Sequence, residues 1–220
     1  MPGRLFWAYF VGCALLAAAI SIAVQRYVRW SATLLGIMFF LFVLLIHLPN
    51  LAANPKNRII WAVVLRDIAF SGGAFALAAQ GRKWMVTLGR IAIAIPVVVF
   101  AVEQFIHPEF VPVVPLQMST PAWIPFAPYW GYLAGAVMLV AGAAMLANRQ
   151  CRAAAAAVGA LVIVLLGCIY LPILGRAKPA DMIEAVNYFA DTMLFGGTVL
   201  LLAGASSEVI YSTPIGPSAS

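Results

Sequence analysis

Residues 59–79 read IIWAVVLRDIAFSGGAFALAA, an unbroken apolar run with one arginine and one aspartate near its centre. A helix needs about 20 mostly apolar residues to cross about 30 Å of hydrocarbon. Strands of a membrane barrel would instead show about 10 residues of alternating polarity. The run therefore predicts a transmembrane α-helix that carries two charges near the middle of the bilayer.

Apolar runs of the same kind occupy most of the remaining chain. Hydrophobic residues make up 65% of the 220 positions and charged residues 9%, whereas soluble domains carry about 25% charged residues. The further runs lie at 5–24, 32–50, 86–106, 128–147, 153–174 and 186–205. We therefore predict an all-α, polytopic transmembrane bundle of about seven helices, with membrane lipid as its surroundings. The start of the first run resembles a signal peptide, but its apolar part is longer than a signal core, so we expect it to remain a helix.

The two parts of the chain resemble each other in sequence. Trp7 and Trp130 match at an offset of 123 positions, which later becomes 124 and pairs Asp67 with Asp191. Gly72-Gly73 likewise matches Gly196-Gly197. Chance similarity between apolar segments would not keep Trp, Asp and Gly-Gly in order, so we predict an internal duplication.

The duplication organises the chain into unequal units. Residues 1–84 would form a partial repeat of three helices, residues 85–206 a complete repeat of four, and residues 207–220 a mobile tail. The helix at 86–106 has no counterpart in the first unit, so the N-terminal copy lacks its first helix. Because a four-helix unit returns to the side where it began, both repeats should have the same orientation, as in some transporters.

Basic residues gather at the ends of the predicted helices. The net charge of +6 does not indicate nucleic-acid binding, because these residues are not clustered on one soluble face. One side would hold Arg26, Arg29, Arg82, Lys83, Arg149 and Arg152, with Arg90 near the boundary. The other would hold Arg4, Lys56, Arg58, Arg176 and Lys178, partly offset by Asp181 and Glu184. The positive-inside rule then predicts an outer N-terminus and an inner C-terminus, in a bacterial cytoplasmic membrane.

Ionisable residues inside spans usually face the bundle interior and are candidates for function. Arg66 and Asp67 are adjacent and should point about 100° apart, which disfavours a direct pair. A pair between helices, from Arg66 to Asp191 or to Glu103, fits the sequence better. The sequence leaves two interpretations of Asp67 and Asp191 open. They could belong to an ion pair that holds the two halves together, or they could form a proton- or ligand-binding site.

Four further residues are candidates for binding a proton or a ligand. Glu103 and His107 are four apart and would share a helix face, although Pro108 favours an end of the helix at that point. His47 corresponds to Tyr170 in the repeat, and both side chains can donate a hydrogen bond to a carbonyl. Each of them is also typical of an interfacial residue. No metal site is predicted, because Glu-x-x-x-His is incomplete and the three cysteines form no C-x-x-C pair.

Loose motifs in the second unit resemble a known family. The residues are Leu88-Gly89-Arg90, then Glu103-Gln104-Phe105-Ile106-His107-Pro108, Trp123-Ile124-Pro125 and Tyr132-Leu133-Ala134-Gly135. Residues 85–205, and more weakly 2–80, resemble the DoxX family of small four-helix bacterial membrane proteins. Its name comes from a small subunit of an archaeal thiosulfate:quinone oxidoreductase. The resemblance implies an accessory subunit of a membrane oxidoreductase with a redox partner protein, and it supplies no catalytic residues.

These observations leave three hypotheses. The first is a subunit that binds a quinone or similar lipid, with hydrogen bonds or protons supplied by Asp67, Asp191, Glu103, His107, His47 and Tyr170. The second is a transporter of a small solute or ion, which parallel repeats favour. The third is a structural partner in which the polar groups only hold the helices together.

Overall fold

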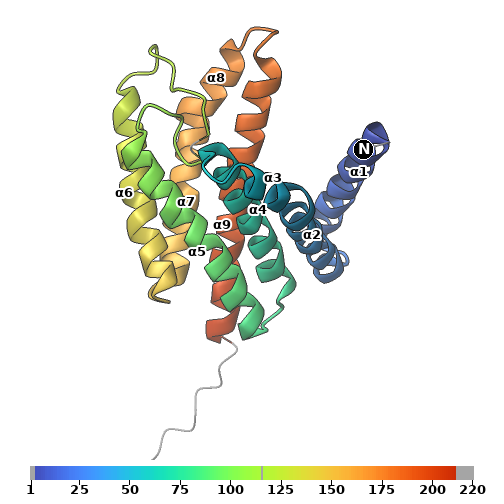
Figure 1. The fold of residues 1–220 in the computed structure, drawn as a ribbon. Coiled ribbons are helices and arrows are strands. Elements are labelled where there is room, and N and C mark those ends of the chain that lie inside the picture. The colour runs from blue at the N-terminus through green and yellow to red at the C-terminus, as the bar shows by residue number, and fades with distance from the viewer. Residues whose placement is uncertain (1–2, 115, 212–220) are drawn as a thin grey trace, which may run out of the picture.

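A computed structural model describes residues 3–114 and 116–211 of the chain. Seven helical segments are long and apolar enough to cross a membrane, as predicted, and they span Leu5–Ala23, Val28–Ala53, Arg58–Ala78, Lys83–Ile106, Ala127–Leu146, Cys151–Arg176 and Met182–Ser206. They define a multi-pass, all-helical membrane protein (Figure 1).

Helices α5 (Lys83–Ile106), α6 (Ala127–Leu146), α7 (Cys151–Leu165) and α9 (Met182–Tyr211) form a closed bundle of four. Each packs on the next, and α9 returns to α5. Its interior is filled by fully buried side chains such as Val97, Phe100, Met138, Val162 and Phe195. Helix α9 continues beyond the predicted boundary at 206, and the rest of the predicted tail, 212–220, lies outside the described residues.

The N-terminal helices are attached to this bundle through α4 (Arg58–Ala78), which packs on α5, α9 and α2 (Val28–Phe42). Helix α1 (Arg4–Ala23) packs on α2 alone and stands apart from the other helices in Figure 1. None of the residues in its apolar window is buried. The exposed apolar faces of α1 are therefore suited to contact with lipid.

Two of the spans have the same internal construction. Helix α2 continues through a π-helix, η1 (Val43–His47), into α3 (Leu48–Ala53). Helix α7 continues in the same way through η2 (Leu166–Tyr170) into α8 (Leu171–Arg176). The three segments have the same lengths in both spans, 15, 5 and 6 residues, and a proline is the second residue after each π-helix. In a π-helix each hydrogen bond encloses one residue more than in an α-helix, and such segments often occur at functional sites.

The ends of the bundle differ in charge and structure. The basic end, which holds Arg26, Arg29, Arg82, Lys83, Arg149 and Arg152, contains the α1–α2, α4–α5 and α6–α7 connections. The opposite loop end contains the connection 107–126, which has an isolated bridge between Phe110 and Ser119. In Figure 1 the loop end is at the top and the basic end at the bottom.

Close helix contacts depend on several of the paired glycines. A Cβ at Gly72 would lie 2.6 Å from Ala92 Cβ, and one at Gly73 would lie 2.4 Å from Thr198 Cγ2. A Cβ at Gly196 would lie 2.6 Å from Val162 Cγ1, whereas one at Gly197 would meet nothing within 4 Å. The three tight positions allow α4 and α9 to approach their neighbours.

Candidate functional site

Four ionisable side chains meet inside the membrane-spanning region, where three helical spans come together. His47 ends η1, Arg66 and Asp67 belong to α4, and Asp191 belongs to α9. His47 Nε2 lies 3.0 Å from Asp67 Oδ2, and Arg66 Nε lies 3.2 Å from Asp67 Oδ1. Arg66 also donates a hydrogen bond from Nη1 to Asp191 Oδ2. We call these four residues the charged network.

Arg66 is the centre of this network because its guanidinium carries several N–H donors in a fixed fork. The predicted pair with Asp191 is present. The expectation that Arg66 would avoid its neighbour Asp67 is wrong, since the long side chain bends until its Nε reaches that carboxylate. Its Cζ also lies 5.6 Å from the centre of the Phe70 ring.

The charged network is largely buried, and its charges do not balance. The Asp67 side chain is 5% exposed and that of Arg66 is 15% exposed, while His47 and Asp191 are more open, at 21% and 32%. Two carboxylates face one permanent cation, so the network carries one uncompensated negative charge when His47 is neutral. An unpaired charge is costly in a low-dielectric interior. One bound proton would remove it.

Glu103 and His107 do not form a common site, although they are four residues apart. Helix α5 ends at Ile106, and His107 adopts a non-helical conformation immediately before Pro108. Glu103 accepts a hydrogen bond from Arg58 Nη1 at 3.2 Å, so the alternative pair of Arg66 with Glu103 does not form. The helix end that Pro108 predicts is therefore present, and Glu103 and His107 have separate partners.

His107 instead contacts Glu109 in the connection, with 3.2 Å between Nδ1 and Oε1. The backbone amide of Glu109 and the His107 ring hold the pKa of the exposed Glu109 carboxyl below its ordinary value. Glu109 carries no signal in the sequence, because a glutamate beside a proline-rich loop is usually an ordinary surface residue.

Tyr170 lies apart from the charged network. It is 2% exposed, and its hydroxyl donates a hydrogen bond to the carbonyl of Pro112 in the loop. Tyr188 on α9 holds the same loop, since its hydroxyl oxygen accepts N–H bonds from Gln117 at 3.0 Å and Met118 at 2.9 Å. His47 and Tyr170 thus occupy matched positions in the predicted repeat, but His47 contacts Asp67 whereas Tyr170 contacts the loop.

A cavity of about 550 Å³ lies near the loop end, between the start of α4 and the end of α5. The Arg58–Glu103 ion pair and Lys56 supply its charged groups. Its other lining residues are mainly apolar and include Trp61, Leu65, Ile95, Val99 and Phe100. We call it the α4–α5 cavity. In the sequence Arg58 counts only as one of the basic residues at the helix ends, because Glu103 lies 45 positions away and no local pattern links the two.

One polar residue of α5 is buried without a partner in the protein. Gln104 is 0% exposed, and its amide nitrogen and oxygen have no hydrogen-bond partner among the described residues. Among the side chains that the structure describes, no three His, Cys, Asp or Glu residues lie together as a possible metal site.

The fold and the charged network define a polytopic helical membrane protein with an ionisable cluster enclosed by its helices. Comparison of the chain with known protein families, curated proteins and solved structures gave no match. The resemblance to the DoxX family therefore stays a prediction.

Proposed function

We propose that this chain is the membrane subunit of a redox system and binds a quinone-like lipid in the α4–α5 cavity. The supporting observation is the composition of that cavity, which combines an apolar wall with one ion pair. A quinone needs both, because its isoprenoid tail is apolar and its carbonyl oxygens accept hydrogen bonds. The volume of about 550 Å³ lies in the usual range for small-molecule pockets.

The proposed roles of the lining residues follow from their chemistry. Arg58 donates to a quinone carbonyl, and Glu103 is a carboxyl that takes or gives a proton at the same place. The quinone ring lies against Trp61, which is 45% exposed. Reduction of a quinone to a quinol takes two electrons and two protons, and in this proposal the electrons come from a partner oxidoreductase, as the resemblance to DoxX proteins implies.

Filling the cavity tests this function. Purified full-length chain in detergent micelles is titrated with a short-tailed ubiquinone, and quenching of tryptophan fluorescence is measured. We expect saturable quenching that falls when Trp61 is replaced by phenylalanine. Val99→Trp fills the cavity and should weaken binding at least about tenfold, because the ring loses its apolar contact area.

Val140→Trp on α6 is the matched control, since Val140 is 72% exposed and lies outside the cavity. It should bind the quinone like the unmodified chain. Equal binding by Val99→Trp and Val140→Trp, or no saturable quenching at all, would overturn the proposal.

A second function, proton-coupled transport of a small solute, is favoured by the charged network. It joins α4 to α9, the helices that correspond in the predicted repeat, and it holds two carboxylates against one arginine, a surplus of negative charge that one proton would offset. Proteoliposomes should then show a solute-dependent proton flux that Asp67→Asn abolishes. Flux that persists in Asp67→Asn would exclude this role for the network.

We also infer that the chain lies in a bacterial cytoplasmic membrane with its basic end inside. The orientation rests on the positive-inside rule and the concentration of arginine and lysine at that end, and the bacterial membrane rests on the resemblance to the DoxX family. Cysteine labelling of Arg26→Cys from one side of intact cells tests the orientation.

We further infer that the chain arose by duplication, which is supported by the matched α2–η1–α3 and α7–η2–α8 spans.

A further inference from the structure

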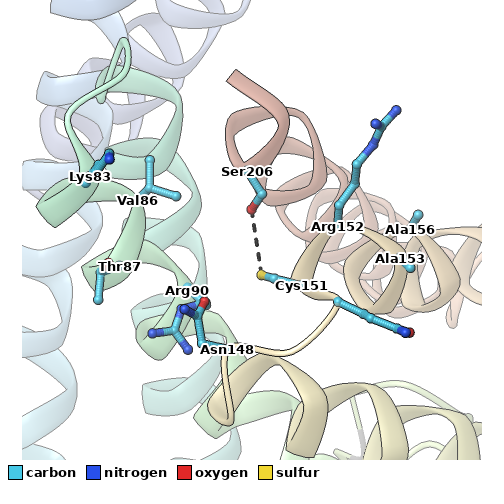
Figure 2. Close-up of a pocket in the computed structure, with 11 residues that line it drawn as sticks. Lys83, Val86, Thr87, Arg90, Asn148, Cys151, Arg152, Ala153, Ala156 and Ser206 are labelled. Carbon is cyan, nitrogen blue, oxygen red and sulfur yellow. Dashed lines mark hydrogen bonds between the residues drawn. The ribbon is translucent and has the colours of Figure 1, made fainter. Parts of the chain in front are cut away.

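A second cavity, of about 670 Å³, opens at the basic end and is separate from the α4–α5 cavity. It lies between the start of α5, the α6–α7 connection, the start of α7 and the last turns of α9 (Figure 2). Its charged lining residues are Lys83, Arg90 and Arg152. We call it the basic cavity.

None of these three cations forms an ion pair with a carboxylate among the side chains that the structure describes. The ion pairs among the described side chains involve His47, Arg58, Arg66 and His107, and none of them involves a residue of the basic cavity. The acidic side chains that the structure describes belong to the charged network or lie towards the loop end. Positive charges that share a cavity repel one another, so this cavity favours an anion.

Arg90 is held in a fixed position inside the basic cavity. It is half-buried, and its Nη1 donates hydrogen bonds to the carbonyls of Met145 and Leu146 in the last turn of α6. The guanidinium has further N–H groups on Nε and Nη2. Such a fork matches the oxygens of a phosphate in spacing and direction.

Neutral polar groups complete the lining. Thr87, Asn148 and Gln150 add polar side chains that can donate. The Ser206 hydroxyl donates to the Leu202 carbonyl at 2.7 Å and lies 3.6 Å from the Cys151 sulfur (Figure 2). The first residues of α7 also line the cavity, and the partial positive charge of a helix N-terminus adds to the attraction for an anion.

The basic cavity lies where the ends of membrane-spanning helices meet the headgroup layer. Trp84 follows Lys83 and is 63% exposed, which is typical of the aromatic anchors found at that depth. Basic pockets between transmembrane helices are suited to the headgroups of anionic lipids. A phosphate group can therefore reach this cavity from the bilayer as well as from the water.

We propose that the basic cavity binds a phosphate group at Arg90, with Lys83 and Arg152 adding positive charge around it, and that the phosphate is carried either by the headgroup of an anionic phospholipid or by a soluble phosphate compound. This site is independent of the quinone site, since the two cavities share no lining residue. It would fix α5, α7 and α9 relative to one another at the basic end.

The test measures the thermal unfolding of the purified full-length chain in a neutral detergent. Phosphatidylglycerol, phosphatidylcholine and inorganic phosphate are each titrated in separate arms. A rise in Tm with phosphatidylglycerol but not with phosphatidylcholine supports a lipid headgroup. An equal rise with inorganic phosphate supports a soluble phosphate compound. The double variant Lys83→Gln/Arg152→Gln should weaken binding roughly 10- to 30-fold, since each cation contributes at the membrane surface.

The matched control is Arg26→Gln/Arg29→Gln, which removes the same charge from the same end but outside the cavity. It should keep the affinity of the unmodified chain within about threefold, because its distant charges are largely screened. Equal losses in the two double variants would show a general surface effect and overturn the site. A Tm that responds to neither phosphatidylglycerol nor phosphate would also overturn it.

Discussion

The guanidinium of Arg66 on α4 donates a hydrogen bond to the carboxylate of Asp191 on α9, 125 positions further along the chain. This contact crosses from the N-terminal helices to the closed four-helix bundle within the membrane-spanning region. Because Arg66 also contacts Asp67, a single cation holds two carboxylates together. The contact is therefore both a link between the halves and a place where charge balance matters.

Asp191→Asn should lower the free energy of unfolding by about 2 kcal/mol, less than the loss for a fully buried pair because Asp191 is partly exposed. Unfolding in mixed micelles with increasing SDS measures this change. The double variant Arg66→Met/Asp191→Leu should lower the free energy of unfolding by less than the sum of the two single variants. Each single variant leaves one member of the ion pair without its partner, whereas the double variant removes both members.

Asp181→Asn is the control for that series, because Asp181 is exposed and makes no ion pair in the described structure. It should change the free energy of unfolding by less than about 0.5 kcal/mol. Equal effects of Asp191→Asn and Asp181→Asn would contradict the role of the contact.

Gly72→Ala should destabilise the protein by about 1–3 kcal/mol, since the new methyl group would overlap Ala92 and force α4 and α5 apart. Gly197→Ala makes the same change on α9, where a Cβ meets nothing within 4 Å. It should leave stability unchanged or raise it, because alanine favours a helix. Thermal unfolding in detergent separates the two, and a more stable Gly72→Ala protein would show that this contact is not tight.

Tyr170→Phe should loosen the connection 107–126. Removal of the hydroxyl leaves the Pro112 carbonyl without its donor, at a cost of about 1–2 kcal/mol. Hydrogen–deuterium exchange should become faster at Val111 and Thr120, whose amides bond within the loop. Tyr129→Phe, at a 69% exposed position, should leave exchange unchanged. Unaltered protection in Tyr170→Phe would refute the tether.

The Glu109 carboxyl should titrate below its ordinary value of 4.5, because its backbone amide and His107 stabilise the ionised form. A lowered pKa in the folded state contributes stability above the unfolded pKa, and this contribution is lost as the pH falls through the folded pKa. Carboxyl-carbon NMR measures the midpoint. His107→Ala should raise it part of the way, since the backbone amide remains. A midpoint at or above 4.5 in the unmodified chain would disprove this prediction.

The sequence predicted the seven spans because length and apolar composition alone determine whether a helix can cross a bilayer. It also predicted the pair of Arg66 with Asp191, since ionisable groups inside a span need partners on neighbouring helices. The break after Ile106 was predictable from Pro108, whose ring disfavours a helical residue before it.

Other features depend on packing that no local pattern records. The π-helices at η1 and η2 add a residue to a turn without a sequence signal, and His47 at the end of η1 contacts Asp67. Helix α1 is as apolar as the others, so its hydropathy did not reveal that it packs on α2 alone. The basic cavity is lined from several separate segments, and only the folded chain brings Lys83, Arg90 and Arg152 to the same place.

The adjacency of Arg66 and Asp67 has a consequence for how the protein is made. At roughly 5–20 residues per second, the ribosome adds Asp191 about 6 to 25 s after Arg66. An arginine at the centre of a span costs about 2.5–3.5 kcal/mol on insertion scales. Asp67 is made directly after Arg66 and is therefore available as its counter-ion throughout that interval, whereas Asp191 is added only with the last helix.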